Sequence, residues 1–492
     1  MKLKLNALAA AAVITTSTWA SEWTGNESDD WFDAANWSAG VPTASTNSVR
    51  ISTASPYSTV IDGGSAATGS SFGVGHNGPG ELSLINGASL VSESASLGNQ
   101  SAGAGSVTIS GQGSSWQVAS GNFDVGGSGG AQLEIVHGGL LQTPSSLIRI
   151  GQMASGTGSV LIDGAGSIWD HQNNFWLGVS GSGQMTISNG GEMVFFGTST
   201  LGQTGNASGE LLITGAASIL SGTRLHVGNG STSGTTLATG LLQLVEGGTL
   251  ELAGPAGSPP ENYRLIIASN SRSEGTVNVG APAGEPPAAP GQLDLYGGIS
   301  FNNGDGTLVF NHTGILEMDF PVVGPANGSA HIQAENGTTL FSDQPFGYSG
   351  SLAIEENAVF GAGGQLGDVV NEGTLVASPG QSTILAIEGD YTHGETAVLE
   401  IQFSPGPTID LVSVSGQAEL NGGGVRIHVL PGNYGNITLD GLYPILVAEG
   451  GRSGEFDQVI TTNPNALSLI YDGDTVYLEV NNQLHRDRYE DD

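Results

Sequence analysis

Cysteine is absent from the 492-residue sequence. This absence excludes a disulfide framework, a zinc site with cysteine ligands and a thiol nucleophile. The rigidity of the fold must therefore come from backbone hydrogen bonds and from the burial of apolar side chains.

Positive charge is scarce. The sequence has 11 Lys and Arg against 46 Asp and Glu, and its formal net charge is −35. The only lysines are Lys2 and Lys4. A field of this sign repels nucleic acid and anionic lipid, so we expect no nucleic-acid partner. Charged residues make up 12% of the chain and hydrophobic residues 38%, a composition that favours a folded core over disorder.

Long apolar runs are also missing. The run Leu5–Ile14 has about half of the roughly 20 residues that a membrane helix needs. It follows the basic residues Lys2 and Lys4 and precedes Thr18-Trp19-Ala20, a small-residue cleavage site. We therefore predict a signal peptide over residues 1–20, export of the mature chain, and no transmembrane segment in it.

Glycine is the residue in excess, with 80 copies and no three-residue period, which excludes collagen. Similar motifs recur instead at a long interval. Leu82, Leu133 and Met185 occupy equivalent positions 51 and 52 residues apart, and each copy contains two halves of 25 to 27 residues. Each half holds a segment of alternating apolar residues closed by Gly-Gly or Asn-Gly, which is typical of a strand and a turn. A half-repeat of this length predicts an all-β solenoid, because stacked coils bury a continuous core that one coil cannot. A β-sandwich would leave the register of the repeats unexplained.

The repeats and the proline distribution divide the chain. Trp23, Trp31 and Trp37 predict an aromatic N-terminal cap, with a sugar-stacking platform as the alternative. Seven of the 20 prolines fall between residues 255 and 290, which we interpret as a surface excursion because proline cannot donate in a central ladder. The predicted regions are 1–20 signal peptide, 21–60 cap, 61–254 repeat solenoid, 255–290 proline-rich excursion, 291–395 second solenoid section, 396–480 C-terminal β region and 481–492 polar tail.

The repeat unit resembles a known type of surface protein. Residues 73–252 carry Val-Gly, then Gly-Ser-Val-Thr-Ile-Ser-Gly, then Gly-Ser-Ser-Trp, and this unit is similar to the repeat of autotransporter-type (type V secretion) and PEP-CTERM-associated proteins. Residues 306–314, 336–340 and 371–380 look like coils of autotransporter passengers, and residues 410–416, 443–446 and 454–456 resemble the folding-nucleating end of such passengers.

The resemblance implies a right-handed parallel β-helix, pectin-lyase-like and with capped ends. It also implies a location outside the cell or at the outer membrane and cell surface of a Gram-negative-type bacterium. The sequence stops about where an autotransporter begins its translocating β-barrel, and it has no Pro-Glu-Pro sorting motif. We therefore expect a passenger-like protein that lacks the C-terminal β-barrel.

Pectate lyases and polygalacturonases share the parallel β-helix, so a polysaccharide-active enzyme is an alternative. The best acidic cluster is Asp163 with Asp170 and His171, and Asp29-Asp30 comes second. Aspartates of solvated turns are commoner than catalytic ones. Trp116 and Trp169 occupy equivalent repeat positions where the third copy has Leu220, which favours packing between coils over sugar stacking.

We predict no catalytic residue, no cofactor and no metal ligand. The predicted function is that of an exported, non-enzymatic adhesin or extracellular matrix scaffold, with extracellular polysaccharide or cell-surface components as partners. The first alternative is a polysaccharide-active β-helix enzyme, either a lyase or a glycoside hydrolase. The second is a passenger fragment separated from its translocator barrel.

Overall fold

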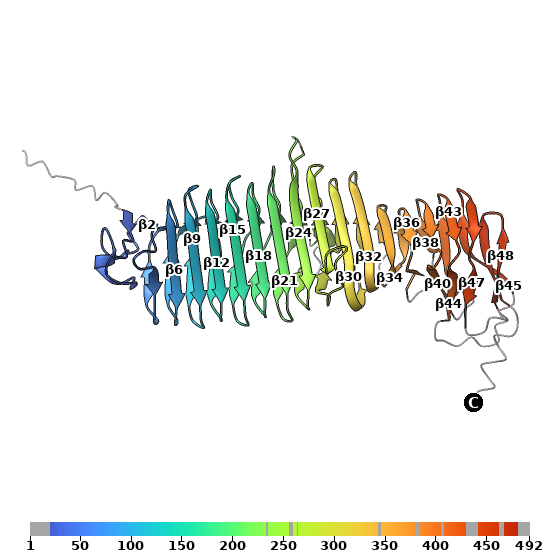
Figure 1. The fold of residues 1–492 in the computed structure, drawn as a ribbon, viewed down its shortest axis with the longest axis horizontal. Coiled ribbons are helices and arrows are strands. Elements are labelled where there is room, and N and C mark those ends of the chain that lie inside the picture. Colours follow the sequence, from blue (N-terminus) through green and yellow to red (C-terminus); the bar gives the residue numbers. More distant parts are fainter. Residues whose placement is uncertain are drawn as a thin grey trace, which may run out of the picture.

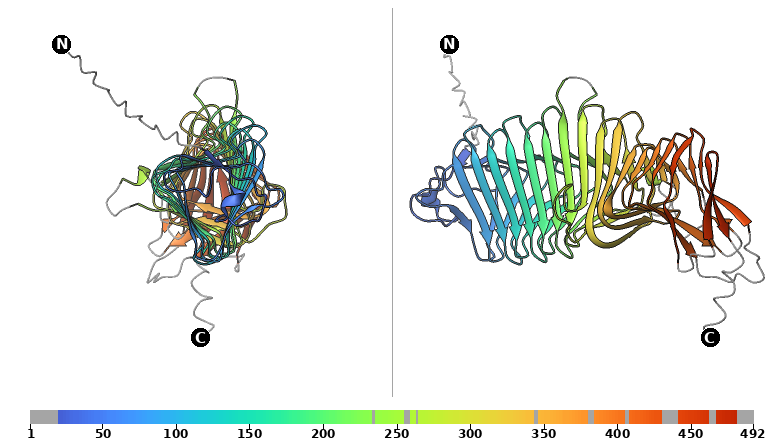
Figure 2. Two further views of the ribbon diagram at one scale, coloured as in Figure 1. Left: turned by 90° about the vertical axis from the view of Figure 1, so that its left-hand side faces the viewer. Right: turned by 45° about the vertical axis from the view of Figure 1, so that its right-hand side comes forward.

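The computed structural model describes residues 20–232, 235–254, 259–262, 264–342, 346–379, 384–404, 408–429, 441–461 and 467–480. Apart from Ala20, the predicted signal peptide lies outside these residues, as does the polar tail 481–492. The described chain forms a rod of stacked parallel strands (Figure 1). Successive coils superimpose when the rod is viewed along its length (Figure 2).

The coils as far as β28 contribute strands to three sheets, which we call sheets 1, 2 and 3, and the later coils contribute to sheets 1 and 3. One typical coil contains β6 (Pro79–Ile85) in sheet 1, β7 (Ser89–Ser92) in sheet 2 and β8 (Ser94–Leu97) in sheet 3. The next coil begins with β9 (Ala104–Ser110), which pairs in parallel with β6.

The strands of sheet 1 are β3 (Thr59–Ile61), β6, β9, β12 (Gly130–Val136), β15 (Thr157–Asp163), β18 (Ser182–Ser188), β21 (Ser208–Thr214), β24 (Ala238–Val245), β27 (Ser273–Gly280), β30 (Asp305–Met318), β32 (Ser329–Phe341), β34 (Ser351–Ala362), β36 (Val369–Asn371), β37 (Thr374–Ala377), β39 (Tyr391–His393), β40 (Val398–Ser404), β41 (Thr408–Ile409), β43 (Ala418–Asn421), β44 (Gly424–Val429), β46 (Arg452–Glu455) and β47 (Gln458–Ile460).

The strands of sheet 2 are β4 (Ala66–Thr68), β7, β10 (Ser115–Val118), β13 (Leu140–Thr143), β16 (Ile168–His171), β19 (Glu192–Val194), β22 (Ile219–Gly222), β25 (Thr249–Leu252) and β28 (Gln292–Leu295). The strands of sheet 3 are β1 (Ala20–Glu22), β2 (Ser48–Ile51), β5 (Ser71–Val74), β8, β11 (Phe123–Val125), β14 (Ile148–Ile150), β17 (Phe175–Leu177), β20 (Thr198–Leu201), β23 (Arg224–Val227), β26 (Leu265–Ile267), β29 (Ile299–Phe301), β31 (Val322–Gly324), β33 (Phe346–Tyr348), β35 (Gly364–Leu366), β38 (Ile384–Ile387), β42 (Leu411–Val414), β45 (Gly441–Ala448), β48 (Leu467–Asp472) and β49 (Thr475–Val480). Two short 3-10 helices, η1 (Ala34–Asn36) and η2 (Pro260–Asn262), lie in the connections.

The strands place alternate side chains in the core. In β9, Val107 and Ile109 are buried while Ser106 and Thr108 are less so, because successive residues of a strand face opposite sides. The buried apolar residues form one cluster that extends from Trp23 to Val480. The prediction of an all-β fold of stacked parallel coils is confirmed.

Glycine at the corner between sheets 3 and 1 explains part of the repeat motif. Gly75 follows β5 with φ +67°, and a Cβ atom there would lie 2.3 Å from the backbone of Ala104 in the next coil. A Cβ atom at Gly105 would lie 2.3 Å from the carbonyl oxygen of Val74. These contacts leave no room for a side chain, so the apolar-Gly pairs of the repeat are a steric requirement of the corner.

The three N-terminal tryptophans are buried together. The Trp31 and Trp37 rings meet edge to face at 4.6 Å, and Trp31 also stacks on Phe72 of β5 at 5.9 Å. The Trp37 Nε1 group donates to the Trp31 carbonyl oxygen at 2.8 Å. Their ring faces therefore cover the first coils from within and are not available as a platform for sugars.

The predicted boundaries of the solenoid are less sharp in the structure. β2 lies before residue 61 and β3 ends at it, yet they pair with β5 and β6, so the stack begins inside the predicted cap. At the other boundary, β36 pairs with β39 and β39 with β43, so the coils continue past residue 395. The last strands change direction, because β49 runs antiparallel to both β45 and β48.

The prediction of one continuous excursion over residues 255–290 is wrong. β26 and β27 lie inside this range and continue sheets 3 and 1. The prolines fall in the connections on either side, and Pro255 lies outside the described residues. The spacing of the prolines in the sequence does not reveal that the strands β26 and β27 lie between them.

The second connection is inserted into the wall of the rod. The amide of Thr313 in β30 donates to the carbonyl oxygen of Ala288 at 2.9 Å, and the amide of Gly247, after β24, donates to that of Pro290 at 2.9 Å. Residues 288–290 thus bridge two coils at the corner between sheets 1 and 2. Sheet 2 ends at β28, next to this insertion.

Candidate functional site

The strongest acidic candidate does not form a catalytic pair. Asp170 and His171 are consecutive in β16, so their side chains face opposite sides of sheet 2. His171 is fully buried, and its Nδ1 atom lies 3.0 Å from both the hydroxyl and the carbonyl oxygen of Thr143. Burial lowers the pKa of His171 and favours its neutral form. Asp170 is only partly buried, and Gln142 donates to it at 3.4 Å.

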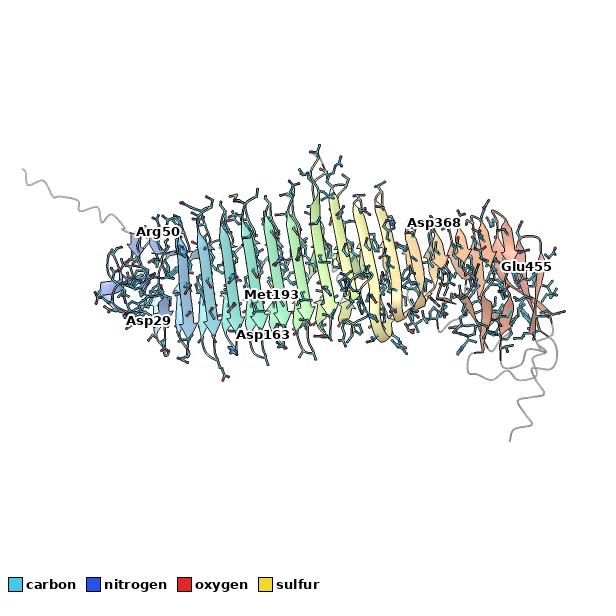
Figure 3. All side chains as sticks on the ribbon, in the orientation of Figure 1. Asp29, Arg50, Asp163, Met193, Asp368 and Glu455 are labelled. Atoms are coloured by element: carbon cyan, nitrogen blue, oxygen red, sulfur yellow. The ribbon has the colours of Figure 1, made fainter. Side chains whose placement is uncertain are left out.

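Asp163 has a structural role at the end of β15. Its Oδ1 atom accepts hydrogen bonds from the Ser188 hydroxyl at 2.6 Å and from the Asn189 amide at 2.7 Å. These two donors hold the pKa of Asp163 below its usual range. The carboxylate ties the turn of one coil to that of the next, at the edge of the rod (Figure 3).

Asp29, which Asp30 follows in the sequence, lies near the N-terminal end of the rod, far along it from Asp163 (Figure 3). Both side chains are exposed, and Asp30 accepts a hydrogen bond from the amide of Phe32 at 2.9 Å. The structure therefore does not bring the two acidic candidates of the sequence together.

An ion pair on the outer side of sheet 3 was not predicted. The Arg149 Nε and Nη2 atoms donate to the two carboxylate oxygens of Asp124 at 2.7 and 2.9 Å. Burial raises the pKa of Asp124, and the hydrogen bonds and charge of Arg149 oppose that rise. The two residues are 25 positions apart, which is one coil, so the repeat length contained the signal.

Charge is distributed unevenly over the three sheets. From β3 to β40, the strands of sheets 1 and 2 contain no Lys or Arg, whereas Arg50, Arg149 and Arg224 lie on strands of sheet 3. Over this range, sheets 1 and 2 therefore present acidic faces, and they repel anionic polymers more strongly than sheet 3 does.

A shallow groove of about 500 Å³ crosses five strands of sheet 1, from β6 to β18. It lies over the first three residues of each strand, where the outermost row is formed by small side chains and one proline. The lining residues are Pro79, Gly80, Glu81, Ala104, Gly105, Ser106, Gly130, Ala131, Gln132, Thr157, Gly158, Ser159, Ser182 and Gln184. Sequence reasoning missed this groove, although the residues occupy the same position in every half-repeat.

The described part of the chain contains no group of three or more His, Asp and Glu residues placed to hold a metal ion. Within the same residues, no helix has the length and apolar character to span a membrane.

Comparison with known proteins finds a partial similarity. Part of this chain is 28% identical over 226 residues to the uncharacterized lipoprotein YdeK of Escherichia coli (strain K12). The aligned region is 44% of this chain and 16% of the relative, so the chain spans about one sixth of the protein that it matches. No family model matches the chain.

Proposed function

We propose that this chain is an exported, non-enzymatic β-solenoid that serves as an adhesin or extracellular matrix scaffold in the manner of an autotransporter passenger. The observation that carries the proposal is the continuous stack of coils around one core, from β2 to β45. Such a rod presents long repetitive faces whose stability is the sum of many similar interfaces, which suits a spacer or binding surface outside the cell.

One further observation supports a location in the cell envelope, and a second supports the solubility of the rods. The partial relative carries the name of a lipoprotein, and lipoproteins are proteins of the envelope. The net charge of −35 would keep neighbouring rods apart and in solution. Within the envelope, we place the protein at the outer surface.

Polysaccharide cleavage remains the alternative hypothesis, and the geometry gives it less support. A lyase or hydrolase needs an acid and a base facing the same substrate. Asp170 faces outward on β16 while His171 is enclosed in the core, and Asp163 is engaged by Ser188 and Asn189.

The proposal is tested in the producing bacterium with an epitope-tagged protein. We expect antibody to label the protein on intact cells or in their matrix, and a deletion strain to lose adhesion or matrix retention. Complementation of the deletion strain with the Gly105→Val variant tests whether adhesion needs the intact rod. The valine side chain would collide with Val74 and prevent the coils from stacking. Confinement of the protein to the cytoplasm, or unchanged adhesion of the deletion strain, would overturn the proposal.

A further inference from the structure

The groove on sheet 1 follows the axis of the rod. Its lining residues come from equivalent positions of β6, β9, β12, β15 and β18, which pair in register as Pro79, Ala104, Gly130, Thr157 and Ser182. Parallel strands are about 4.8 Å apart, so the groove extends over about 19 Å. Its direction and length suit an extended polymer rather than a compact small molecule.

The side chains two residues further along each of these strands alternate in length with a period of two coils. From β6 to β18 the register aligns Glu81, Ser106, Gln132, Ser159 and Gln184, so that a serine separates each long polar side chain from the next. The alternation ends there, because the residue aligned with Gln184 in β21 is Glu210. Two coils correspond to about 9.6 Å along the axis. A ligand that repeats every two units, with each unit close to one coil in length, would meet the same groups at every repeat.

The alternating row is polar and uncharged over its central strands. Glu81 is the only charged residue in the lining. Among the residues that the structure describes, the side chains of Ser106, Gln132 and Ser159 have no hydrogen-bond partner. The Gln184 side-chain amide donates to Glu210 Oε2 at 3.0 Å, which leaves its amide oxygen and its second N–H for a ligand. Gln132 and Ser159 are exposed. The groove thus offers hydroxyl and amide groups, which can donate and accept hydrogen bonds, to a ligand that lies in it.

An extended peptide fits the groove poorly. Peptides that bind by strand addition need an open sheet edge, and β9, β12 and β15 each pair with a neighbour on both sides. A polyanion is disfavoured by the acidic faces of sheets 1 and 2. A neutral polymer rich in hydroxyl groups meets neither obstacle.

We propose that this groove binds an extended, neutral, β-1,4-linked polysaccharide parallel to the axis of the rod. In such a chain each sugar is turned over relative to the last, which gives it a two-sugar repeat comparable in length to two coils. Gln132 and Gln184 contact every second sugar, and Ser106 and Ser159 contact the sugars between them. This inference deepens the proposed function, because it names the class of matrix component that the rod would hold.

The test uses purified mature chain with two probes, hydroxyethyl cellulose in affinity electrophoresis and cellohexaose in titration calorimetry. We expect retardation by hydroxyethyl cellulose, heat of binding with cellohexaose, and little effect of added salt, because no ion is exchanged. The double variant Gln132→Ala/Gln184→Ala should bind cellohexaose about tenfold more weakly, since it loses two sets of hydrogen bonds. The matched control is Gln117→Ala, which removes an exposed amide of β10 on sheet 2 and should leave binding unchanged.

Three binding results would each overturn the inference: no binding of either probe, unchanged affinity of the double variant, or stronger binding to polygalacturonate than to the neutral glucan. Self-association of the rods that Gln132→Ala/Gln184→Ala abolishes would also overturn it, because the groove would then contact a second copy. Failure of the proposed function is measured by separate experiments.

Antibody labelling of intact cells reports surface location whether or not the groove binds sugar. New reducing ends in the hydroxyethyl cellulose would show that the groove binds the polymer and cleaves it.

Discussion

Asp124 and Arg149 form a two-pronged ion pair between adjacent coils, with Nε to Oδ1 at 2.7 Å and Nη2 to Oδ2 at 2.9 Å. Their side chains are 11% and 20% exposed. The pair is therefore partly shielded from water, and it connects β11 to β14 on the outer side of sheet 3.

Replacing Arg149 alone should destabilise the rod. We expect Arg149→Gln to lower the free energy of unfolding by about 2 kcal/mol, because it leaves the shielded carboxylate of Asp124 without its partner. The double variant Asp124→Asn/Arg149→Gln should recover part of this loss. Urea denaturation followed by circular dichroism measures both.

The control for that pair is Arg50, which lies 3.3 Å from Glu22 on the same sheet. Because both side chains are largely exposed, Arg50→Gln should cost less than about 1 kcal/mol. Equal losses for Arg149→Gln and Arg50→Gln would contradict the role assigned to shielding.

The close approach of Gly105 to Val74 in the neighbouring coil leads to a second prediction. Gly105→Ala should destabilise the protein by about 1–3 kcal/mol, because its Cβ atom would lie 2.3 Å from the carbonyl oxygen of Val74 and the coils would have to separate. Gly73→Ala is the matched control on β5, since its nearest neighbour, His76, is 3.5 Å away. We expect Gly73→Ala to be neutral or slightly stabilising. A melting temperature for Gly105→Ala at or above that of Gly73→Ala would refute the steric explanation.

Asp170 and His171 should respond differently to substitution. Asp170→Ala removes an outward carboxylate whose contact with Gln142 is long, and it should change stability by no more than about 0.5 kcal/mol. His171→Ala opens a cavity in the core and removes the hydrogen bond to Thr143, which should cost about 3 kcal/mol. Thermal unfolding measures both variants. A loss of polysaccharide turnover on Asp170→Ala, with unchanged stability, would instead favour the enzyme hypothesis.

Two histidines, the fully buried His393 and the partly buried His226, predict a loss of stability in mild acid. Burial lowers the pKa of His226 and of His393 to about 4 in the folded protein, against about 6.5 in the unfolded chain. Between these values the unfolded chain binds the proton and the folded protein does not, so the stability falls as the pH decreases from 6.5 to 4. The slope is about 1.4 kcal/mol per pH unit for each histidine.

The histidine contribution is isolated by comparing variants. His393 lies in the core, with Nδ1 2.8 Å from the Tyr391 hydroxyl and Nε2 3.1 Å from the carbonyl oxygen of Ala397. His393→Asn should be less stable than the wild type at pH 7, and its stability should fall less steeply between pH 6.5 and 4. Parallel curves for the two proteins over this range would show that His393 does not titrate on unfolding.

Some positions were predictable because the pattern that determines them is local. The alternation of Val107 and Ile109 indicates a strand with one buried side, and the following glycine indicates a turn. The same alternation separates Asp170 from His171, although their adjacency in sequence had suggested a pair. Ser106, Gln132 and Ser159, which line the groove, also occupy equivalent positions in the sequence repeats. The groove itself exists because the residues two positions earlier in each strand are small, and the repeats alone do not show this.

By itself, the sequence determined the repeat length, the all-β coil and the positions that face the core, because strand alternation and turn glycines act over a few residues and stacking repeats them. Only the tertiary structure decided which outward residues meet across coils, as Asp124 and Arg149 do, and that residues 288–290 insert between coils. These outcomes depend on coil-to-coil register and on the path of long connections. Both are set by contacts between residues distant in sequence, which no local pattern specifies.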